Sequence, residues 1–425
     1  MGTIVLFGLF FVFLLIKIPI PFSLALSGMF TLVFVTGRPV IVVVQRMATS
    51  MESFSLLAIP LFILAGEIIN KSGAGERLVR FANQLVGHIT GGLAHSNILA
   101  SMFFGGISGS ASADTAAIGS ILIPAMSNSG YPKDFATAVT ITSSPIGNLI
   151  PPSITLVIYG WLAGVQISKL FIAGIVPGIL VGFMLMGVSY YLSKKHNYGM
   201  HQKFNSHELW RSFVEALPAL VLPIIILGGM FTGIFTATEA AAVAVVYSFF
   251  ISIFIYKQPR LSELPAVFVK SCKLSGSVVL LIAMTGGFGW IMSIEKIPLY
   301  LSNAFLSITP NGLMFLFSVI VISLIVGCFL TPTSALVLLV PILIPVAQSF
   351  RLDLLHFGMV LVSALIIGHV TPPVGLCLYI GSSISGIPVS KLIKPTMPFF
   401  CVLILLSILI ALFPGIVLTL PKMLL

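Results

Sequence analysis

Long runs of apolar residues, separated by short polar connections, extend along almost the whole chain. Runs of about 18 or more apolar residues are typical of helices that cross a membrane. The pattern predicts about ten crossings, at 3–18, 20–36, 53–69, 134–162, 171–192, 213–235, 237–256, 275–293, 354–384 and 397–420. We therefore expect an all-α polytopic membrane protein.

Two further apolar stretches, 97–128 and 312–346, carry Gly, Ser, Thr and Pro at their centres. We interpret each as a re-entrant hairpin, a pair of helices that enters the membrane and returns on the same side. Segments 38–51 and 261–273 mix basic with apolar residues, which is typical of helices that lie in the membrane interface. We expect these segments to form two interfacial arms.

The composition supports a membrane protein and leaves no room for a soluble domain. Hydrophobic residues make up 58% of the 425 residues and charged residues only 8%, whereas soluble domains carry about 25% charged residues. The longest polar stretch, 194–211, is too short to form a core. The first 22 residues lack a basic start and a small-residue cleavage site, so we interpret them as a first span and not as a removed signal peptide.

The net charge of +10 could indicate a nucleic acid partner, but the positions of the basic residues favour a membrane explanation. With the N-terminus outside, 15 of the 21 Lys and Arg residues fall on one side, and the other side keeps Arg38, Arg46, Lys169, Lys296, Arg351 and Lys422. Positive residues concentrate on the cytoplasmic side of membrane proteins. The distribution predicts two periplasmic termini, provided that neither hairpin crosses, and no nucleic acid partner.

The two halves of the chain repeat each other with a shift of 221 residues, which places ILIP at 121–124 on ILIP at 342–345 and Pro151–Pro152 on Pro372–Pro373. Five predicted crossings lie between the two hairpins, so the second repeat is inverted relative to the first. Inverted repeats with broken helices are the architecture of secondary transporters. We divide the chain into scaffold helices with an arm (1–52), the first repeat (53–192), a linking loop with two scaffold helices (193–260), and the second arm with the second repeat (261–425).

Each Pro-Pro pair interrupts a predicted crossing, because proline has no N–H and clashes with the preceding turn. Backbone groups freed in this way cost several kcal/mol each in hydrocarbon unless protein or an ion binds them. The breaks and tips offer carbonyl and hydroxyl oxygens, which suit Na⁺ as a coupling ion. The predicted sodium ligands are Gly106, Gly147, Ile150 and Ser153, with their repeat mates Gly327, Gly368, Thr371 and Val374. The alternative is that these positions serve close helix packing.

Few ionisable residues lie within the predicted membrane segments. Asp114 follows the first tip and has no acidic repeat mate, so it stabilises an ion or the tip, or else interacts with a helix N-terminus. His369 matches Asn148 beside a Pro-Pro pair, and a hydrogen-bonding role is favoured over a proton relay. Glu67 and Glu239 lie near predicted helix ends and are expected to cap helices or face the interface.

The sequence GISG at 106–109 raises an alternative from another class. GxSG with a distant histidine is typical of rhomboid-like intramembrane serine proteases, with Ser108 as nucleophile and His95 or His369 as base. The motif is short, and its counterpart after the shift reads GCFL. A protease does not require a duplicated broken helix, and a purely structural subunit does not explain paired breaks. We therefore expect a protein that is not an enzyme.

Several blocks resemble, in order, the large membrane subunit of tripartite ATP-independent periplasmic (TRAP) transporters: FSLLAIPLFILAGEIIN (54–70), SGSASADTAAIGSILIPAM (108–126), IPPSITLVIYG (150–160), ISKLFIAGIVPG (167–178) and GIFTATEAAAVAVVYS (233–248). The resemblance implies sodium-driven import of a sialic acid, C4-dicarboxylate or sugar acid, with the hairpins and broken helices moving as an elevator. It also implies a bacterial inner-membrane location, a small four-helix membrane subunit and a periplasmic binding protein as partners, and no cofactor besides Na⁺. Stand-alone divalent-anion/sodium symporters are an alternative, but their Ser-Asn-Thr signatures are missing at both tips.

The resemblance places the acid between the two tips, where hydroxyls, an amide and half-helix N–H groups are available. The predicted substrate residues are Ser110, Ser112, Asn148, Thr331 and Thr333. The hairpins and breaks contain no arginine, so the sequence does not predict the charge of the substrate.

Overall fold

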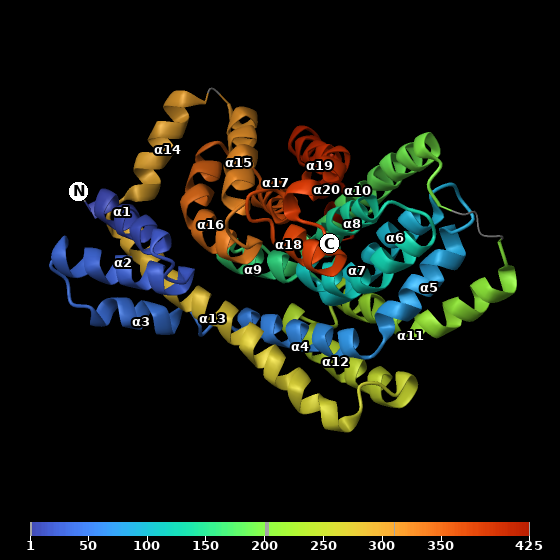
Figure 1. The fold of residues 1–425 in the computed structure, drawn as a ribbon. Helices are drawn as coiled ribbons and strands as arrows, with labels where there is room; N and C mark the ends of the chain where they lie inside the picture. Colours follow the sequence, from blue (N-terminus) through green and yellow to red (C-terminus); the bar gives the residue numbers. More distant parts are fainter. Residues whose placement is uncertain (1, 200–203, 310, 425) are drawn as a thin grey trace.

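The structure is a computed structural model that describes residues 2–199, 204–309 and 311–424 (Figure 1). Every regular element in this part of the chain is helical. In chain order the elements are α1 Gly2–Leu15, α2 Ile20–Phe34, α3 Ile41–Thr49, η1 Phe54–Leu57, α4 Ala58–Lys71, α5 Ala74–Val86, α6 Gly92–Ser108, α7 Ala111–Asn128, α8 Lys133–Ser143, η2 Ser144–Asn148, α9 Ile154–Ala163, α10 Ile167–His196, α11 Ser206–Phe231, α12 Ala237–Phe250, η3 Ile251–Tyr256, η4 Leu261–Glu263, α13 Leu264–Ile294, α14 Ile297–Ile308, α15 Gly312–Gly327, α16 Pro332–Ser349, α17 Leu354–Ile367, η5 Gly368–Val370, α18 Leu376–Ser385, α19 Val389–Leu412 and α20 Gly415–Leu424.

Seven helices of the described residues are long and apolar enough to cross a membrane. Six coincide with predicted crossings: Phe54–Lys71, α10, α11, Ala237–Tyr256, Leu261–Ile294 and α19. The seventh is α16, the second helix of the second predicted hairpin. The predicted crossings 3–18 and 20–36 are the shorter helices α1 and α2, of 14 and 15 residues. The all-α membrane class is confirmed, and the number of ten crossings stays a prediction.

Both predicted hairpins and both predicted breaks are present. Two residues join α6 to α7, and four join α15 to α16. Each Pro-Pro pair lies in a link without regular structure, one between η2 and α9 and the other between η5 and α18. That each hairpin re-enters the membrane on one side stays a prediction.

The two repeats interlock through these elements. α9, which follows the first break, packs against α16 of the second hairpin, and α18, which follows the second break, packs against α7 of the first. Each hairpin also lies on its own break, because α6 contacts η2 and α15 contacts η5. The reciprocal packing brings the interruptions of both repeats to the middle of the molecule (Figure 1).

A second group of helices runs along one side of this region. α13 packs along α2, α3 and α4, while α12 lies on α4 and α11 lies on α5. We refer to α2, α3, α4, α11, α12 and α13 as the side layer, which Figure 1 shows below the hairpins. The side layer and the interlocked repeats together form the frame of the site described below.

The predicted interfacial arms are only partly correct. Segment 38–51 contains the separate helix α3. Segment 261–273 was wrongly expected to be separate, since η4 leads directly into α13, which runs to Ile294 without interruption. Pro265, the helix's one proline, lies in the first turn, where it is compatible with a helix. Hydropathy also missed α5 and α14, which follow α4 and α13 at matching places in the two repeats.

Candidate functional site

A cavity of about 690 Å³ lies where the tips and breaks of both repeats adjoin the side layer. Its volume is in the range of small-molecule binding sites. The lining includes all five residues predicted to bind the substrate: Ser110, Ser112, Asn148, Thr331 and Thr333. The fold therefore brings the polar residues of both repeats to one space.

Each hairpin tip ends one helix and begins the next within a few residues. Gly109 ends α6 in the left-handed conformation (φ +60°), which suits glycine. The hydroxyl of Ser110 accepts a hydrogen bond from the N–H of Ala113 (3.4 Å) and so caps α7. Thr331 accepts one from the N–H of Ser334 (3.3 Å) and caps α16 in the same way. Two helix N-termini thus lie at the cavity, and such termini favour a negatively charged ligand.

Asn148 ties the first break to the first hairpin. Its side-chain oxygen accepts the N–H of Ala111 (2.6 Å), the first residue of α7. Its side-chain nitrogen donates to the hydroxyl of Thr155 (3.0 Å) in α9. The buried amide is therefore used within the protein, although it lines the cavity.

Glycines allow the first hairpin to approach the first break closely. A Cβ on Gly105 would lie 2.5 Å from the Cα of Gly147, so this contact requires glycine at position 105. Gly106 faces the chain slightly further on, where a Cβ would lie 3.6 Å from the side chain of Ile150 and 3.6 Å from the carbonyl oxygen of Pro151. The structure thus places Gly106, Gly147 and Ile150 at one junction, and close packing is one reason for its glycines.

The prolines leave two carbonyls of the first break without helical donors. The helical partner of the Gly147 carbonyl would be residue 151, and that of the Asn148 carbonyl would be residue 152; both are proline and have no N–H. The hydroxyl of Ser153 donates to the Asn148 carbonyl (2.6 Å) and accepts the N–H of Leu156 (3.3 Å). Ser153 thus replaces one lost hydrogen bond and caps α9.

The second break has the same design and is more open. A Cβ on Gly327 would lie 3.1 Å from the Cα of Gly368, and one on Gly368 would overlap the backbone of Gly327. The N–H of Thr371 donates to the Gly368 carbonyl (3.1 Å), and its hydroxyl donates to the Ile367 carbonyl (2.8 Å). Val374 is 45% exposed, whereas Ser153 at the equivalent position is buried.

Asp114 is fully buried behind the first tip and does not line the cavity. Its Oδ2 accepts the hydroxyl of Ser101 (2.8 Å) in α6, and that hydroxyl lies 3.1 Å from the hydroxyl of Ser143 in α8. Within the described chain, Oδ1 has no hydrogen-bond partner. The contacts of Asp114 therefore join both helices of the hairpin to the broken helix.

The residues of the protease alternative do not form a catalytic pair. Ser108 and His369 both line the cavity, but neither ring nitrogen of His369 has a hydrogen-bond partner among the residues described. His95 lies 13 residues from Ser108 on α6, about 20 Å along the helix, and its Nε2 lies 3.0 Å from the carbonyl oxygen of Thr90. Neither histidine is hydrogen-bonded to Ser108 in the part of the chain that the structure describes.

The side layer supplies charges that sequence reasoning missed. Lys270 of α13 forms an ion pair with Glu67 of α4, with 2.8 Å between Nζ and Oε2, and both residues line the cavity together with Asn70 and Lys71. The Glu67 side chain is only 9% exposed, so the expectation that it caps a helix or faces the interface is wrong. The two partners are 203 positions apart, and no local pattern reports such a contact.

The expectation for Glu239 is confirmed. Its carboxylate accepts the N–H of Thr236 (2.8 Å), and its own N–H donates to the hydroxyl of Thr236 (3.3 Å). This reciprocal pair is the capping box at the start of α12.

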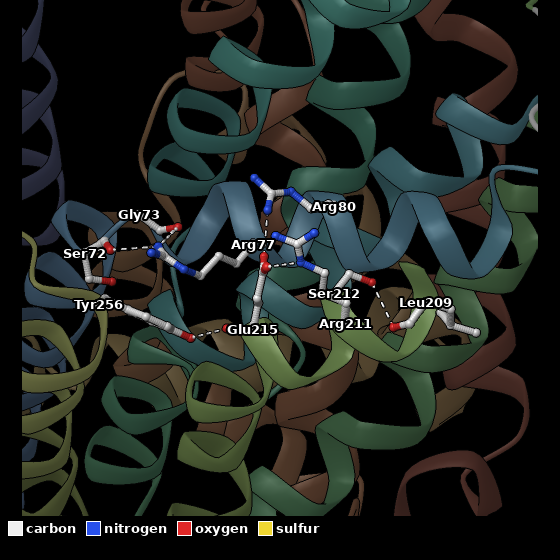
Figure 2. A network of polar contacts seen from close by, with 9 residues as sticks. All are labelled: Ser72, Gly73, Arg77, Arg80, Leu209, Arg211, Ser212, Glu215 and Tyr256. Atoms are coloured by element: carbon white, nitrogen blue, oxygen red, sulfur yellow. Dashed lines mark hydrogen bonds and ion pairs between the residues drawn. The ribbon is translucent and has the colours of Figure 1, made fainter. Parts of the chain in front are cut away.

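Figure 2 shows a second polar cluster, which joins α5 to α11 and η3. Glu215 of α11 pairs with Arg80 of α5 (2.7 Å) and with Arg211 one turn earlier (3.3 Å). The guanidinium of Arg77 lies 4.1 Å from the ring centre of Tyr256 in η3. These contacts join three elements around a smaller cavity of about 440 Å³.

A helical membrane protein with two hairpins and two broken helices around one cavity is, by architecture, a secondary transporter. The chain matches the family described as "Tripartite ATP-independent periplasmic transporter, DctM component" over residues 7–416. It belongs to this family, the large permease subunits of TRAP transporters, which are transporters and not enzymes. The resemblance found in the sequence is thereby confirmed, and the protease alternative and the stand-alone symporter are set aside.

Two relatives and one solved structure show how far the similarity extends. The sialic acid TRAP transporter large permease protein SiaM of Vibrio cholerae is 38% identical over 405 residues, which cover 95% of each chain. The C4-dicarboxylate TRAP transporter large permease protein DctM of Pseudomonas aeruginosa is 38% identical over 400 residues, 94% of each chain. The YdaH transporter of Alcanivorax borkumensis has a similar fold, with a TM-score of 0.64 at 13% identity over 88% of each chain.

Proposed function

We propose that the chain is the translocating subunit of a sodium-coupled importer for an organic acid. Its relatives are named for sialic acid and for C4-dicarboxylates, so a small molecule with a carboxylate is the proposed substrate. A periplasmic binding protein delivers the acid, and a small four-helix membrane subunit binds to the chain in the bacterial inner membrane.

The observation that carries this proposal is the single cavity lined by Ser110, Ser112, Asn148, Thr331 and Thr333. The residues come from both hairpins and from the first break, which are otherwise distant in the sequence. Hydroxyls and two helix N-termini suit a carboxylate, and the Asn148 amide lines the same space while it is bonded to Ala111 and Thr155. Substrate binding at this cavity is therefore supported by geometry as well as by sequence.

Sodium is proposed to bind at the two breaks. The carbonyls of Gly147 and Ile150 belong to the first site with Gly106 and Ser153, and those of Gly368 and Thr371 belong to the second with Gly327 and Val374. The support is that Pro151 and Pro372 stand where the helical donors of the Gly147 and Gly368 carbonyls would be, and that a hairpin backbone approaches the break closely in each repeat. With two sodium ions per monoanion, one net charge crosses the membrane, and this contributes about 2.3 kcal/mol at 100 mV. Two sodium ions can therefore concentrate a monoanion strongly.

The interlocked hairpins and broken helices are proposed to move as an elevator against the side layer. The cavity reaches Lys71 and Lys270, which the charge distribution assigns to the cytoplasm. With the proposed orientation, the cavity therefore opens toward the cytoplasm, as in an inward-facing state. The same distribution supports periplasmic termini.

Reconstituted transport tests this proposal. The chain is placed in liposomes with its small subunit, the binding protein is added outside, and uptake of labelled N-acetylneuraminate, D-gluconate or succinate is measured. We expect uptake of at least one acid that requires an inward sodium gradient and the binding protein. Uptake that follows ATP or a proton gradient and ignores sodium would refute the coupling.

A further inference from the structure

Asn148 and His369 occupy equivalent positions in the two repeats, but only the Asn148 side chain forms hydrogen bonds within the described part of the protein. Asn148 engages both ends of its amide, with Ala111 and Thr155. His369 is 6% exposed and lines the cavity, yet both of its ring nitrogens lack a partner among the described residues. Buried polar groups are normally hydrogen-bonded. The imidazole is therefore available to a molecule that enters the cavity.

Positive charge enters the cavity from the side layer. The Lys270 ammonium has three N–H donors, of which the carboxylate of Glu67 occupies one at 2.8 Å. Glu67 is buried and so holds this ammonium at the cavity. The charged residues of the lining are Glu67, Lys71 and Lys270, which leaves one net positive charge when His369 is neutral.

We propose that the cavity binds a hydroxylated monocarboxylate, with its carboxylate on Lys270 and a hydroxyl or amide group on His369. This inference rests on the proposed function and narrows its substrate class. The one net positive charge of the lining matches one carboxylate, whereas a dicarboxylate would leave the occupied cavity with a net charge of −1. A neutral imidazole has one N–H donor and one acceptor nitrogen, and both lack a partner among the described residues. A carboxylate can satisfy only the N–H, whereas the hydroxyls of a sugar acid or a sialic acid can satisfy both nitrogens.

Lys270 and His369 recognise different groups of the substrate, and they belong to different parts of the molecule. Lys270 belongs to the side layer, and its charge selects acids against neutral sugars. His369 belongs to the second break, and its ring selects molecules that carry hydroxyl or amide groups. Glu67 is a positioning residue that acts through Lys270.

Direct binding to the purified chain, held with its small subunit in nanodiscs with saturating sodium, tests the inference. The probes are N-acetylneuraminate, D-gluconate and succinate, measured by calorimetry without the binding protein. Lys270→Gln alone would leave Glu67 buried and unpaired, so the decisive variant is Lys270→Gln with Glu67→Gln. Lys270→Arg tests whether a different cationic side chain at this position supports binding of the acid. Lys273→Gln is the matched control, because Lys273 is exposed on the same helix and does not line the cavity.

We expect a monocarboxylate to bind more tightly than succinate. The double variant should weaken its binding about 10- to 100-fold, as expected for lost hydrogen bonds to a charged group, while Lys270→Arg and Lys273→Gln stay near the wild type. His369→Leu, which roughly keeps the buried volume, should weaken binding by up to about tenfold with a melting temperature near that of the wild type, because the ring makes no hydrogen bond within the described part of the protein.

The binding measurements distinguish failure of the proposed function from failure of this inference. If the wild-type chain binds none of the three acids, the proposed function fails and the inference fails with it. If succinate binds and the monocarboxylates do not, or if the variants bind a monocarboxylate like the wild type, the proposed function stands and the inference is overturned.

Discussion

The side-chain oxygen of Asn148 lies 2.6 Å from the backbone nitrogen of Ala111, and this hydrogen bond joins the first break to the first hairpin tip. The Ala111 N–H belongs to the first turn of α7, where N–H groups have no partner within the helix. A residue beside the Pro-Pro pair thus completes the start of a helix 37 positions earlier. The hairpin and the broken helix are therefore one structural unit.

Replacing Asn148 with alanine should destabilise this unit. The change leaves the buried Ala111 N–H without an acceptor and the Thr155 hydroxyl without a donor, and an unsatisfied buried group costs about 1–3 kcal/mol. We expect a lower melting temperature for Asn148→Ala in purified protein. Thr155→Val, which removes only the second hydrogen bond (3.0 Å), serves as the control and should have a smaller effect. An unchanged melting temperature for Asn148→Ala would contradict this assignment.

Gly368→Ala should disrupt the contact between the second hairpin and the second break by steric overlap. A Cβ at this position would overlap the backbone of Gly327, and backbone cannot move aside as a flexible side chain can. Overpacking typically costs about 1–3 kcal/mol, and here it also separates the hairpin from the break. We expect reduced thermal stability and loss of sodium-driven uptake.

The control is Gly289→Ala in α13, where a Cβ would meet nothing within 4 Å. Alanine is favoured over glycine inside a helix by about 0.5–1 kcal/mol, so this variant should be neutral or slightly stabilised. Equal behaviour of the two variants would show that the close approach at Gly368 has no consequence.

The sequence predicted the breaks and tips well, because their signals are local. A Pro-Pro pair removes two backbone donors wherever it stands, and the constant shift of 221 residues pairs the two copies. The amphipathic helix α5 was missed because it is short and carries charged residues, and α14 was missed because it has only 12 residues, although it is apolar. The extension of α13 through 264–273 was missed because basic residues on a helix end resemble an interfacial helix.

Contacts between distant elements could not be predicted in this way. The ion pair of Glu67 with Lys270 depends on how α4 packs on α13. The sequence of neither helix indicates which other helix it contacts. The same limit applies to Gly105, which makes the close contact with Gly147. In the second repeat the equivalent contact to Gly368 is made by Gly327, whose repeat mate is Gly106 and not Gly105. A repeat shift aligns residues by number, whereas packing selects the residue that faces the neighbour.

Thr371→Val should change the sodium requirement only slightly. The Thr371 hydroxyl donates to the Ile367 carbonyl (2.8 Å), and the proposed sodium ligand at this position is the backbone oxygen. Losing one such hydrogen bond costs about 0.5–1.5 kcal/mol. We expect the sodium concentration for half-maximal uptake to rise by less than about tenfold, with Thr371→Ser close to the wild type. Complete loss in Thr371→Val that Thr371→Ser restores would identify the hydroxyl itself as a ligand.

Gly66→Leu should block movement of the first hairpin past the side layer. A Cβ on Gly66 would lie 3.4 Å from the Cα of Ser108 at the hairpin tip, so alanine just fits and leucine does not. We expect Gly66→Ala to transport at nearly the wild-type rate and Gly66→Leu to lose transport. Proteoliposome uptake measures the rate, and thermal unfolding shows whether Gly66→Leu still folds. Normal transport by a folded Gly66→Leu would show that the close approach of α4 to this tip does not limit the movement of the hairpin.

Burial should decide which of two ion pairs contributes to stability. In the arginine cluster of Figure 2, the Arg80 and Glu215 side chains are 56% and 30% exposed, and exposed pairs contribute about 0–1 kcal/mol. Glu67 is 9% exposed, so removing Lys270 leaves a buried charge, which costs several kcal/mol when burial is complete. We expect Lys270→Ala to lower the melting temperature clearly, Arg80→Ala to lower it little, and Glu67→Gln to restore stability in the Lys270→Ala background. If Arg80→Ala were the more damaging change, the anchoring of α5 to α11 would outweigh the buried pair in holding the side layer together.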